Sequence, residues 1–171
     1  MKKKILIFIV TYNASFRLLK VLKKIKKINK KNDIFSVLIS DDYSKDNTVN
    51  YIKKLKTSQK LKINLNKKNV GYGANNKKCL NYAIKKKFDY AVMLHGDDQY
   101  DAKYIPNMVK ELKKLNVHAV TGSRMINKSD ALTGGMPIYK FIGNIVLTKL
   151  FNILCNTNFT DCHTGLWGYD L

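Results

Sequence analysis

The segment YAVMLHGDDQYD, residues 90–101, is an apolar run that ends in polar side chains able to do chemistry. His95 closes the run, and the carboxylates Asp97 and Asp98 and the amide of Gln99 follow it directly. Charge at the end of a buried strand is costly unless it faces a cleft and meets a cation or a ligand. The pattern therefore predicts that this segment borders a binding site.

Four other apolar runs of the sequence are also followed by polar clusters. The five runs are typical of strands, several of them apolar on both faces, and cover residues 5–10, 35–40, 61–66, 90–95 and 118–123. The other clusters read TYNAS, SDDYSKDNT, NKKNVGYGANN and GSRM. Each cluster alone fits ordinary turn chemistry. Because ligands gather at the carboxyl ends of parallel strands, five clusters at one edge favour a site there.

Helical periodicity is found between these runs. The expected helices cover residues 16–28, 47–55, 75–87, 102–115 and 139–155. Ser15 is expected to cap the first helix and Asp46 the second. Strands that alternate with helices predict an α/β fold whose parallel sheet is covered on both faces.

Length and composition favour a single domain over residues 1–171. Of the 171 residues, 45% are hydrophobic, which is ordinary for a globular domain with a buried core. No apolar stretch reaches the roughly 20 residues of a membrane-spanning helix, and the start MKKKILIFIVTYN lacks a signal-peptide cleavage site. These features predict a cytoplasmic protein. The three cysteines show no CxxC spacing, so neither a disulfide framework nor a zinc site is indicated.

The formal net charge of +20 suggests an anionic partner. Lysines are spread over every expected helix, Arg17 and Arg124 are the two arginines, and basic residues do not alternate with aromatic ones as in RNA-binding segments. A solvated lysine-rich surface is the first interpretation, and attraction to an anionic membrane is the second. Specific nucleic-acid binding is not expected.

Six motifs in order along the chain resemble those of a known family. VTYN, SDDYSKDNT, NVGYGAN, LHGDDQYD, GSRM and DCHTGLWGYDL are similar to the motifs of family 2 glycosyltransferases, especially the branch of polyprenyl-phosphate mannose and glucose synthases. The resemblance covers nearly the whole chain. It implies the glycosyltransferase A fold, a Rossmann-like three-layer sandwich with a mostly parallel central sheet.

The resemblance also implies a nucleotide-sugar site. Gly71, Gly73 and Ala74 resemble the loop beside the ribose and phosphates of the donor. Gln99 matches the glutamine of the family's Asp-x-Asp-x-Gln metal motif. The positions that match the nucleoside contacts are Thr11, Tyr12, Asn13, Asp41 and Asp42.

The same motif implies a divalent cation, Mn²⁺ or Mg²⁺. Asp97 matches the second aspartate of the motif and is the main candidate for a ligand and a catalytic residue, whereas His95 stands in place of the first aspartate. Imidazole binds Mn²⁺, so His95 is either a ligand or a structural residue, and Asp98 is either a second ligand or solvated. The cation would neutralise the diphosphate leaving group as the glycosidic bond breaks.

Two interpretations of the acceptor remain open in the sequence. Arg124 of GSRM matches a position where relatives hold an acceptor phosphate, which is already ionised and needs no base. Lys140 is a weaker candidate for the same task. A hydroxyl acceptor would instead need a catalytic base, for which Asp161 and His163 of DCHTG are the candidates.

The apolar stretch YKFIGNIVLTKLFNILC, residues 139–155, also has two interpretations. Its apolar width fits a core helix, and it equally fits a helix lying on a membrane, where a polyprenyl acceptor would be found. The chain then ends at GYDL in an expected strand. Relatives commonly continue with further helices, so the sequence can represent a catalytic domain without its C-terminal continuation.

The resemblance thus implies an inverting, metal-dependent hexosyltransferase of cell-envelope biosynthesis that uses a UDP- or GDP-linked sugar and a polyprenyl-phosphate acceptor. The alternative is transfer to a hydroxyl of a glycan or a protein. A basic module that binds nucleic acid or membrane without catalysis is a remote third interpretation, which the ordered catalytic motifs oppose. The expected location is the cytoplasm, with peripheral attachment to the cytoplasmic face of the membrane.

Overall fold

The computed structural model of the chain describes residues 2–28, 33–55, 60–115 and 117–171. The chain divides into two compact units: residues 1–120 with 166–171 form the first, and residues 121–165 form the second. That both units belong to one catalytic domain stays a prediction.

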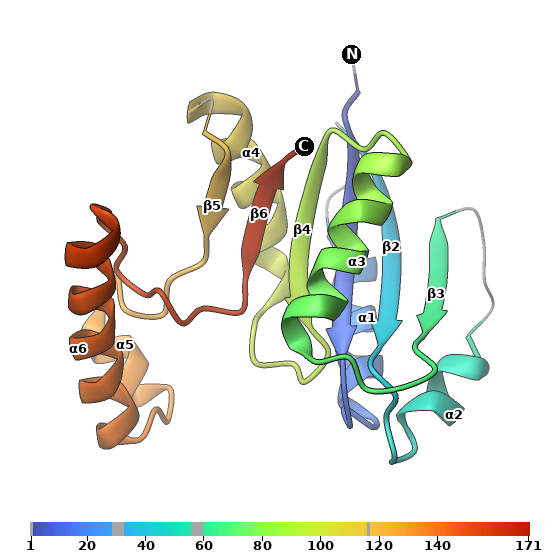
Figure 1. The fold of residues 1–171 in the computed structure, drawn as a ribbon, viewed down its shortest axis with the longest axis horizontal. Helices are drawn as coiled ribbons and strands as arrows, with labels where there is room; N and C mark the ends of the chain where they lie inside the picture. Colours follow the sequence, from blue (N-terminus) through green and yellow to red (C-terminus); the bar gives the residue numbers. More distant parts are fainter. Residues whose placement is uncertain (1, 29–32, 56–59, 116) are drawn as a thin grey trace. The chain divides into compact units, whose positions relative to one another are not determined.

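Within the described residues, six strands form one sheet in the order β3-β2-β1-β4-β6-β5. The strands are β1 (Lys4–Thr11), β2 (Ile34–Asp41), β3 (Leu61–Leu65), β4 (Tyr90–His95), β5 (Ala119–Thr121) and β6 (Trp167–Asp170). β1 pairs in parallel with β2 and β4, and β2 with β3, so the arrowheads of these four strands point to one edge in Figure 1. β6 runs antiparallel to β4. The predicted α/β class with a mostly parallel sheet is confirmed.

The helices fill the predicted connections, and one further short helix is present. They are α1 (Arg17–Lys26), α2 (Thr48–Lys53), α3 (Tyr72–Lys85), the 3₁₀ turn η1 (Ala102–Tyr104), α4 (Ile105–Leu115), α5 (Lys128–Thr133) and α6 (Ile138–Cys155). Periodicity does not predict α5, because its six residues make less than two helical turns.

The two predicted helix caps have different outcomes. The cap prediction for Ser15 is wrong: its backbone lies in the left-handed region with φ 49°, and its amide donates to Thr48 Oγ1. Asp46 does serve the start of α2, since its Oδ1 accepts from the Thr48 amide at 2.9 Å. Thr48 thereby connects the loop after β1 with the start of α2.

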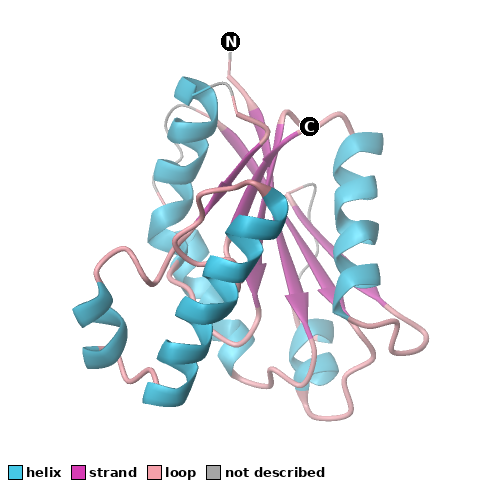
Figure 2. Cartoon of the chain, turned by 60° about the vertical axis from the view of Figure 1, so that its left-hand side comes forward, coloured by secondary structure: helices cyan, strands magenta, loops and turns pink. Residues whose placement is uncertain are grey.

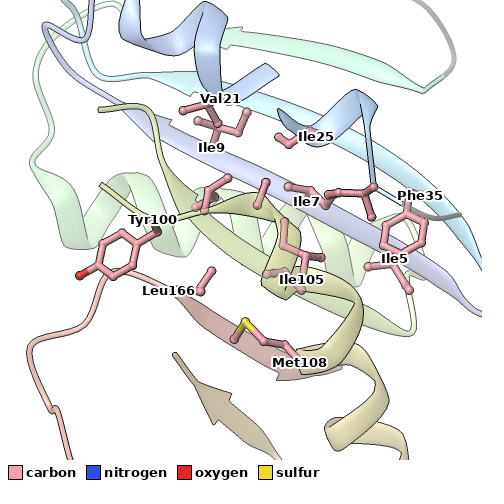
Figure 3. Packing of buried hydrophobic residues seen from close by; sticks show 14 of the residues in the cluster. Ile5, Ile7, Ile9, Val21, Ile25, Phe35, Tyr100, Ile105, Met108 and Leu166 are labelled. Carbon is pink, nitrogen blue, oxygen red and sulfur yellow. The ribbon is translucent and has the colours of Figure 1, made fainter. Parts of the chain in front are cut away.

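β1 lies between two apolar layers, because successive side chains of a strand point to opposite faces. One face packs with α1 and with the η1–α4 segment, and the other packs with α3. The residues of the two faces are Ile5, Ile7 and Ile9 on one and Leu6, Phe8 and Val10 on the other. Figure 3 shows the first layer, with Val21, Ile25, Ile105 and Met108 around β1. In Figure 2, helices stand on either side of the strands.

The second unit contains α5, α6 and the loop after α6. In α6 the buried side chains are polar and the large apolar side chains are exposed, which is the reverse of a core helix. The polar Asn144, Thr148 and Asn152 recur every four residues on its least exposed face. Its exposed large apolar side chains are Ile138, Tyr139, Ile142, Val146, Leu147, Leu150, Phe151, Ile153 and Leu154. Within the described residues, α6 thus lacks the burial expected of a core helix, which is one of the two interpretations of residues 139–155.

Candidate functional site

A cavity of about 260 Å³ lies at the carboxyl edge of the sheet in the first unit. Its wall is formed by the ends of β1 and β4 and by the segments that follow β2 and β3. Ligands bind at this edge in open α/β sheets. The cavity is thus where the polar clusters of the sequence predict a site.

The predicted site residues of the first unit divide between the cavity wall and the loops around it. Those on the wall are Thr11, Tyr12, Asp42, Gly71, His95 and Asp97. Those described in the same loops but off the wall are Asn13, Asp41, Gly73, Ala74, Asp98 and Gln99. Three further polar residues line the wall that were not predicted as site residues: Asn69, Tyr72 and Asn75. The asparagines on either side of the two glycines in NVGYGANN are the sequence feature that could have indicated these positions.

Thr11 ends β1 and places a polar atom in the cavity wall. The residue is 4% exposed, and no hydrogen-bond partner among the described residues reaches its Oγ1. A Cβ at Gly96 would lie 2.6 Å from this oxygen, so glycine is required opposite it. A buried hydroxyl without a partner costs free energy unless a ligand or water completes it. Thr11 therefore points to a ligand in this cavity.

Asp41 and Asp42 are both buried and hold loops in place through their carboxylates. Asp41 accepts from the turn that follows β2. Asp42 accepts from the amides of Val70 and Gly71, each at 2.9 Å, and from Asn66 Nδ2 at 3.0 Å. Asp42 also lines the cavity, whereas Asp41 does not. The nucleoside contact predicted for this pair is thus better placed at Asp42.

The loops after β1 and β2 are joined through Asn13. Its amide donates to Ser44 Oγ, and its Oδ1 accepts from the Lys45 amide, both at 2.9 Å. Asn13 and Tyr43 have positive φ angles of 50° and 67°, and Asp98 after β4 has one of 64°. Such angles are costly for residues other than glycine and concentrate at functional sites. Asn13 therefore positions this edge of the sheet without lining the cavity.

His95, the last residue of β4, lies between two tyrosine rings. Its ring centroid is 5.5 Å from that of Tyr72 and 5.8 Å from that of Tyr100, with edge-to-face geometry in both pairs. The Nε2 atom is buried, and the residue lines the cavity. Burial raises the pKa of Tyr72, so this phenol stays neutral at neutral pH. The two rings restrict the orientation of the imidazole at the cavity wall.

Asp97 and Asp98 have different surroundings although they are adjacent. Asp97 lines the cavity, and its Oδ1 accepts from the Gln99 amide at 3.2 Å. Asp98 lies off the wall, and its Oδ1 is 2.8 Å from the Nζ of Lys24 in α1. This ion pair makes Asp98 an anchor of the loop after β4 and argues against the predicted role of Asp98 as a metal ligand.

A divalent cation fits this wall together with a ligand that brings oxygen atoms of its own. His95 and Asp97 can supply one nitrogen and one carboxylate ligand. Within the described residues, no group of three or more His, Cys, Asp or Glu side chains could hold a metal by itself. Mg²⁺ in nucleotide sites typically takes one or two carboxylates and completes its shell with phosphate oxygens and water. The donor set therefore suits a cation that binds with a diphosphate.

In the second unit, Arg124 and Asp161 form an ion pair. Arg124 donates to the carboxylate through Nε at 2.9 Å and Nη2 at 3.3 Å, and Asn144 of α6 donates at 2.8 Å. The Asp161 side chain is fully buried, whereas 34% of the Arg124 side chain is exposed. Burial alone would raise the pKa of Asp161, but the hydrogen bonds from Arg124 and Asn144 outweigh it and hold that pKa below its ordinary value. These properties make Asp161 a weak general base.

His163 and Cys162 lie beside this ion pair. The His163 carbonyl accepts from Arg124 Nη2 at 3.2 Å, and its Nδ1 is 3.0 Å from Cys162 Sγ. The Cys162 amide donates to Thr148 Oγ1 of α6 at 3.2 Å. These contacts hold the loop of residues 161–163 against α6 and help to fix the direction of the guanidinium.

Relatives of known sequence share much of this chain. The sequence model of the family described as Glycosyl transferase family 2 matches residues 6–171. An uncharacterized protein of Methanocaldococcus jannaschii is 29% identical over 157 residues, which are 88% of this chain and 63% of that protein. The low-salt glycan biosynthesis hexosyltransferase Agl6 of Haloferax volcanii is 29% identical over 79 residues, which are 46% of this chain and 19% of that protein.

Two solved structures share the fold. The mannosyltransferase PcManGT from Pyrobaculum calidifontis, solved with GDP-Man and Mn²⁺, matches with a TM-score of 0.68 and 17% identity over 99% of this chain and 45% of that one. Residues 1–349 of S. aureus TarS, solved with UDP-GlcNAc, match with a TM-score of 0.56 and 18% identity over 74% of this chain and 38% of that one. This chain thus spans less than half of either solved chain. The likeness in structure shows the glycosyltransferase A fold, and the match over residues 6–171 shows that the chain belongs to glycosyltransferase family 2.

Proposed function

We propose that the chain is the catalytic part of an inverting, metal-dependent hexosyltransferase that moves a sugar from a nucleoside diphosphate to a polyprenyl phosphate. The observation that carries this proposal is the cavity at the carboxyl edge of the sheet. There the buried hydroxyl of Thr11 lies on the same wall as His95 and Asp97. A concave site with a few convergent polar groups is typical of a small-molecule ligand.

On the donor side, several residues on the wall and beside it have a task. Asp97 and His95 would hold the divalent cation, which supplies positive charge against the diphosphate leaving group. The backbone N–H of Gln99 donates to Asp97 Oδ1 and would keep that carboxylate aimed at the cavity. Tyr12 is half exposed at the wall and would pack against the nucleoside.

Nucleotide binding is the first test of this proposal. In a thermal-shift assay, UDP or GDP with Mn²⁺ should raise Tm, since a ligand at 100 times its Kd stabilises the folded state by about 2.7 kcal/mol. Mn²⁺ without nucleotide should change Tm little, because the wall offers it two protein ligands. Mn²⁺ should support binding better than Mg²⁺, since imidazole suits Mn²⁺ better. If no nucleotide shifted Tm with either cation, the donor assignment would be wrong.

On the acceptor side, the proposal depends on Arg124. Asp161 aligns its guanidinium, and about a third of the Arg124 side chain is exposed. A phosphate acceptor is ionised and needs positioning rather than a base. A hydroxyl acceptor needs a base, and Asp161 is buried with a lowered pKa. These properties favour a lipid phosphate over a hydroxyl of a glycan or a protein.

A polyprenyl acceptor would be met at a membrane surface, and α6 offers a face for that surface. At about 100° per residue, its exposed apolar side chains form one broad arc of the helix, with Lys149 and Lys140 inside the arc near its two edges. The sequence of α6 contains no acidic residue. Lysines that flank an apolar face interact with anionic headgroups while the apolar side chains enter the bilayer boundary. The apolar face of α6, residues 138–154, is thus suited to an anionic bilayer.

The contacts of α6 favour a helix that lies on the membrane over one that crosses it. By length and composition its 18 residues could span a bilayer, and 11% of them are buried. However, Asn144 binds Asp161, and Asn152 binds both the amide and the carbonyl of Phe159. A spanning helix would leave the attached loop at membrane depth, where irregular backbone facing lipid is not tolerated. We expect peripheral attachment, on the cytoplasmic face of the membrane.

Vesicle binding tests this face. Replacing Val146 and Leu150 with Asp should weaken sedimentation with phosphatidylglycerol vesicles by at least about tenfold, because burial of each large apolar side chain contributes roughly 1.5–3 kcal/mol. Ile84→Asp is the matched control, since Ile84 is similarly exposed on α3 of the first unit. Equal binding of all three proteins would contradict the assignment. A dimer that the paired substitution dissociates would show that a second copy covers this face instead.

A further inference from the structure

The exposed aromatic side chains of the first unit gather at one edge of its sheet. Among the described residues of this unit, each exposed aromatic side chain lies in a segment that follows the carboxyl end of a parallel strand. These side chains are Tyr12 and Phe16 after β1, Tyr43 after β2, Tyr72 after β3 and Tyr104 after β4. Phe35 and Tyr90, at the amino ends of β2 and β4, are buried instead. The edge that carries the cavity therefore also carries the exposed aromatic rings.

Three of these rings lie off the cavity wall, and each has a lysine ammonium near its face. The distances from Nζ to the ring centroid are 5.1 Å for Lys20 and Phe16, 3.7 Å for Lys45 and Tyr43, and 5.0 Å for Lys103 and Tyr104. These six residues form the aromatic rim. All three lysines are exposed, and Lys103 stays 65% exposed although it is 3.6 Å from Asp101 Oδ2. The rim thus presents apolar rings and positive charges together.

An aromatic ring beside a lysine suits the boundary of a bilayer. Amphipathic rings lie at the level of the headgroups, and lysine keeps its ammonium among them while its stem covers apolar surface. Single-stranded nucleic acid also stacks on exposed rings, but it follows a continuous basic groove. The three pairs of the rim instead stand on three separate segments, after β1, β2 and β4. This arrangement favours an extended anionic surface as the partner.

We propose that the aromatic rim places the carboxyl edge of the sheet against an anionic lipid surface. The inference rests on the proposed function for the lipid acceptor, and it adds a contact in the first unit to the apolar face of α6 in the second. Phe16 lies two residues after Ala14, and Tyr43 directly follows Asp42; Ala14 and Asp42 both line the cavity. A bilayer held by the rim would bring the acceptor phosphate near the cavity while the polyprenyl chain stays in the lipid.

Tryptophan fluorescence can locate this contact. Phe16→Trp places a reporter in the rim, and Ile34→Trp is the matched control, because Ile34 is 43% exposed at the amino end of β2. Trp167 is common to both variants. Phosphatidylglycerol vesicles with brominated acyl chains should quench the reporter at residue 16 and leave the one at residue 34 nearly unchanged, because only the first reaches the bilayer boundary. Equal quenching of the two reporters, or none at residue 16, would overturn the inference.

Removal of charge tests the lysines of the rim. Replacing Lys20, Lys45 and Lys103 with Gln should weaken sedimentation with phosphatidylglycerol vesicles by at least about tenfold, because each lysine near an anionic surface contributes to binding. The matched control replaces lysines 85–87, which are exposed where α3 ends, at the opposite edge in Figure 1. It removes the same charge. Equal losses would show attraction by net charge alone and would overturn the inference.

Nucleotide binding separates this inference from the proposed function. No residue of the rim lines the cavity, so the variant without the rim lysines should keep the Tm shift with UDP or GDP and Mn²⁺. Its transfer to polyprenyl phosphate in phosphatidylglycerol vesicles should fall by at least about tenfold. Unchanged transfer would overturn the inference and leave the proposed function standing. A natural chain that bound no nucleotide would instead overturn the proposed function.

The Phe16→Trp reporter also distinguishes a membrane from a nucleic acid. Its emission should respond to phosphatidylglycerol vesicles and stay unchanged with single-stranded oligouridylate. A response to the oligonucleotide and not to the vesicles would make the carboxyl edge a nucleic-acid surface and overturn the inference.

Discussion

Asp97→Asn should abolish sugar transfer and weaken Mn²⁺-dependent nucleotide binding while the fold stays intact. Asp97 is the carboxylate on the cavity wall that can hold the cation beside His95. Loss of its charge would remove several kcal/mol of stabilisation of the diphosphate leaving group, and about 3 kcal/mol corresponds to more than a hundredfold in rate. Turnover of a radiolabelled sugar nucleotide, together with Tm, measures both effects.

Asp98→Asn is the matched control for this experiment. The substitution is chemically identical and one residue away, but Asp98 binds Lys24 and does not line the cavity. Breaking this partly exposed ion pair should cost about 1 kcal/mol of stability or less and change turnover by only a few fold. Near wild-type turnover of Asp97→Asn, or equal losses in both variants, would contradict the metal assignment.

Much of the fold could be predicted from the sequence because its strands are short and strongly apolar. The run ILIFIV predicts β1, since a strand covered on both faces needs apolar side chains in both directions. The loop after β1 could not be predicted in the same way. Ser15 has the residue type of a helix cap, but its amide donates to Thr48 Oγ1, a side chain 33 residues away. Such contacts between loops are not visible in local sequence.

The site could be predicted in its position and in part of its membership. The polar clusters at the carboxyl ends of β1 and β4, together with the family motifs, pointed to Thr11, His95 and Asp97, which all line the cavity. They could not separate Asp97 from Asp98, because the difference comes from a lysine on α1 and from a backbone angle of 64°. Composition likewise predicted that α6 is broadly apolar, but not which of its faces is exposed. That face is decided by the polar contacts of Asn144, Thr148 and Asn152 on the opposite side.

Arg124→Ala should damage transfer far more than donor binding. A charge-assisted bidentate contact with the acceptor phosphate contributes about 1.5–3 kcal/mol, which corresponds to roughly ten- to a hundredfold in rate. His163→Ala should have a milder effect, because the exposed ring is not required by an ionised acceptor. If Arg124→Ala were harmless and Asp161→Asn eliminated turnover, a general-base mechanism on a hydroxyl acceptor would be the better interpretation.

A structural role of the Arg124–Asp161 pair must be separated from a role in binding the acceptor. Removing one residue leaves the other without its ion-pair partner. Asp161→Asn or Arg124→Ala should therefore each cost about 2 kcal/mol or more of stability, a value already reduced because a third of the Arg124 side chain is exposed. Replacing both, Arg124→Met with Asp161→Leu, should recover most of that loss, because apolar replacements of buried ion pairs are often neutral.

The recovered variant decides whether Arg124 binds the acceptor. If it does, the double variant should fold well, bind the nucleotide normally and still transfer sugar at least about tenfold more slowly. A double variant with recovered turnover would leave the pair a structural role alone.

The pH dependence of stability gives an independent check of the ion pair. The pKa of Asp161 is lowered in the folded chain, so its contribution to stability is present above the unfolded pKa and is lost as the pH falls through the folded value. Acid unfolding monitored between neutral pH and pH about 2 should therefore lose this component in the double variant and keep it in His163→Ala.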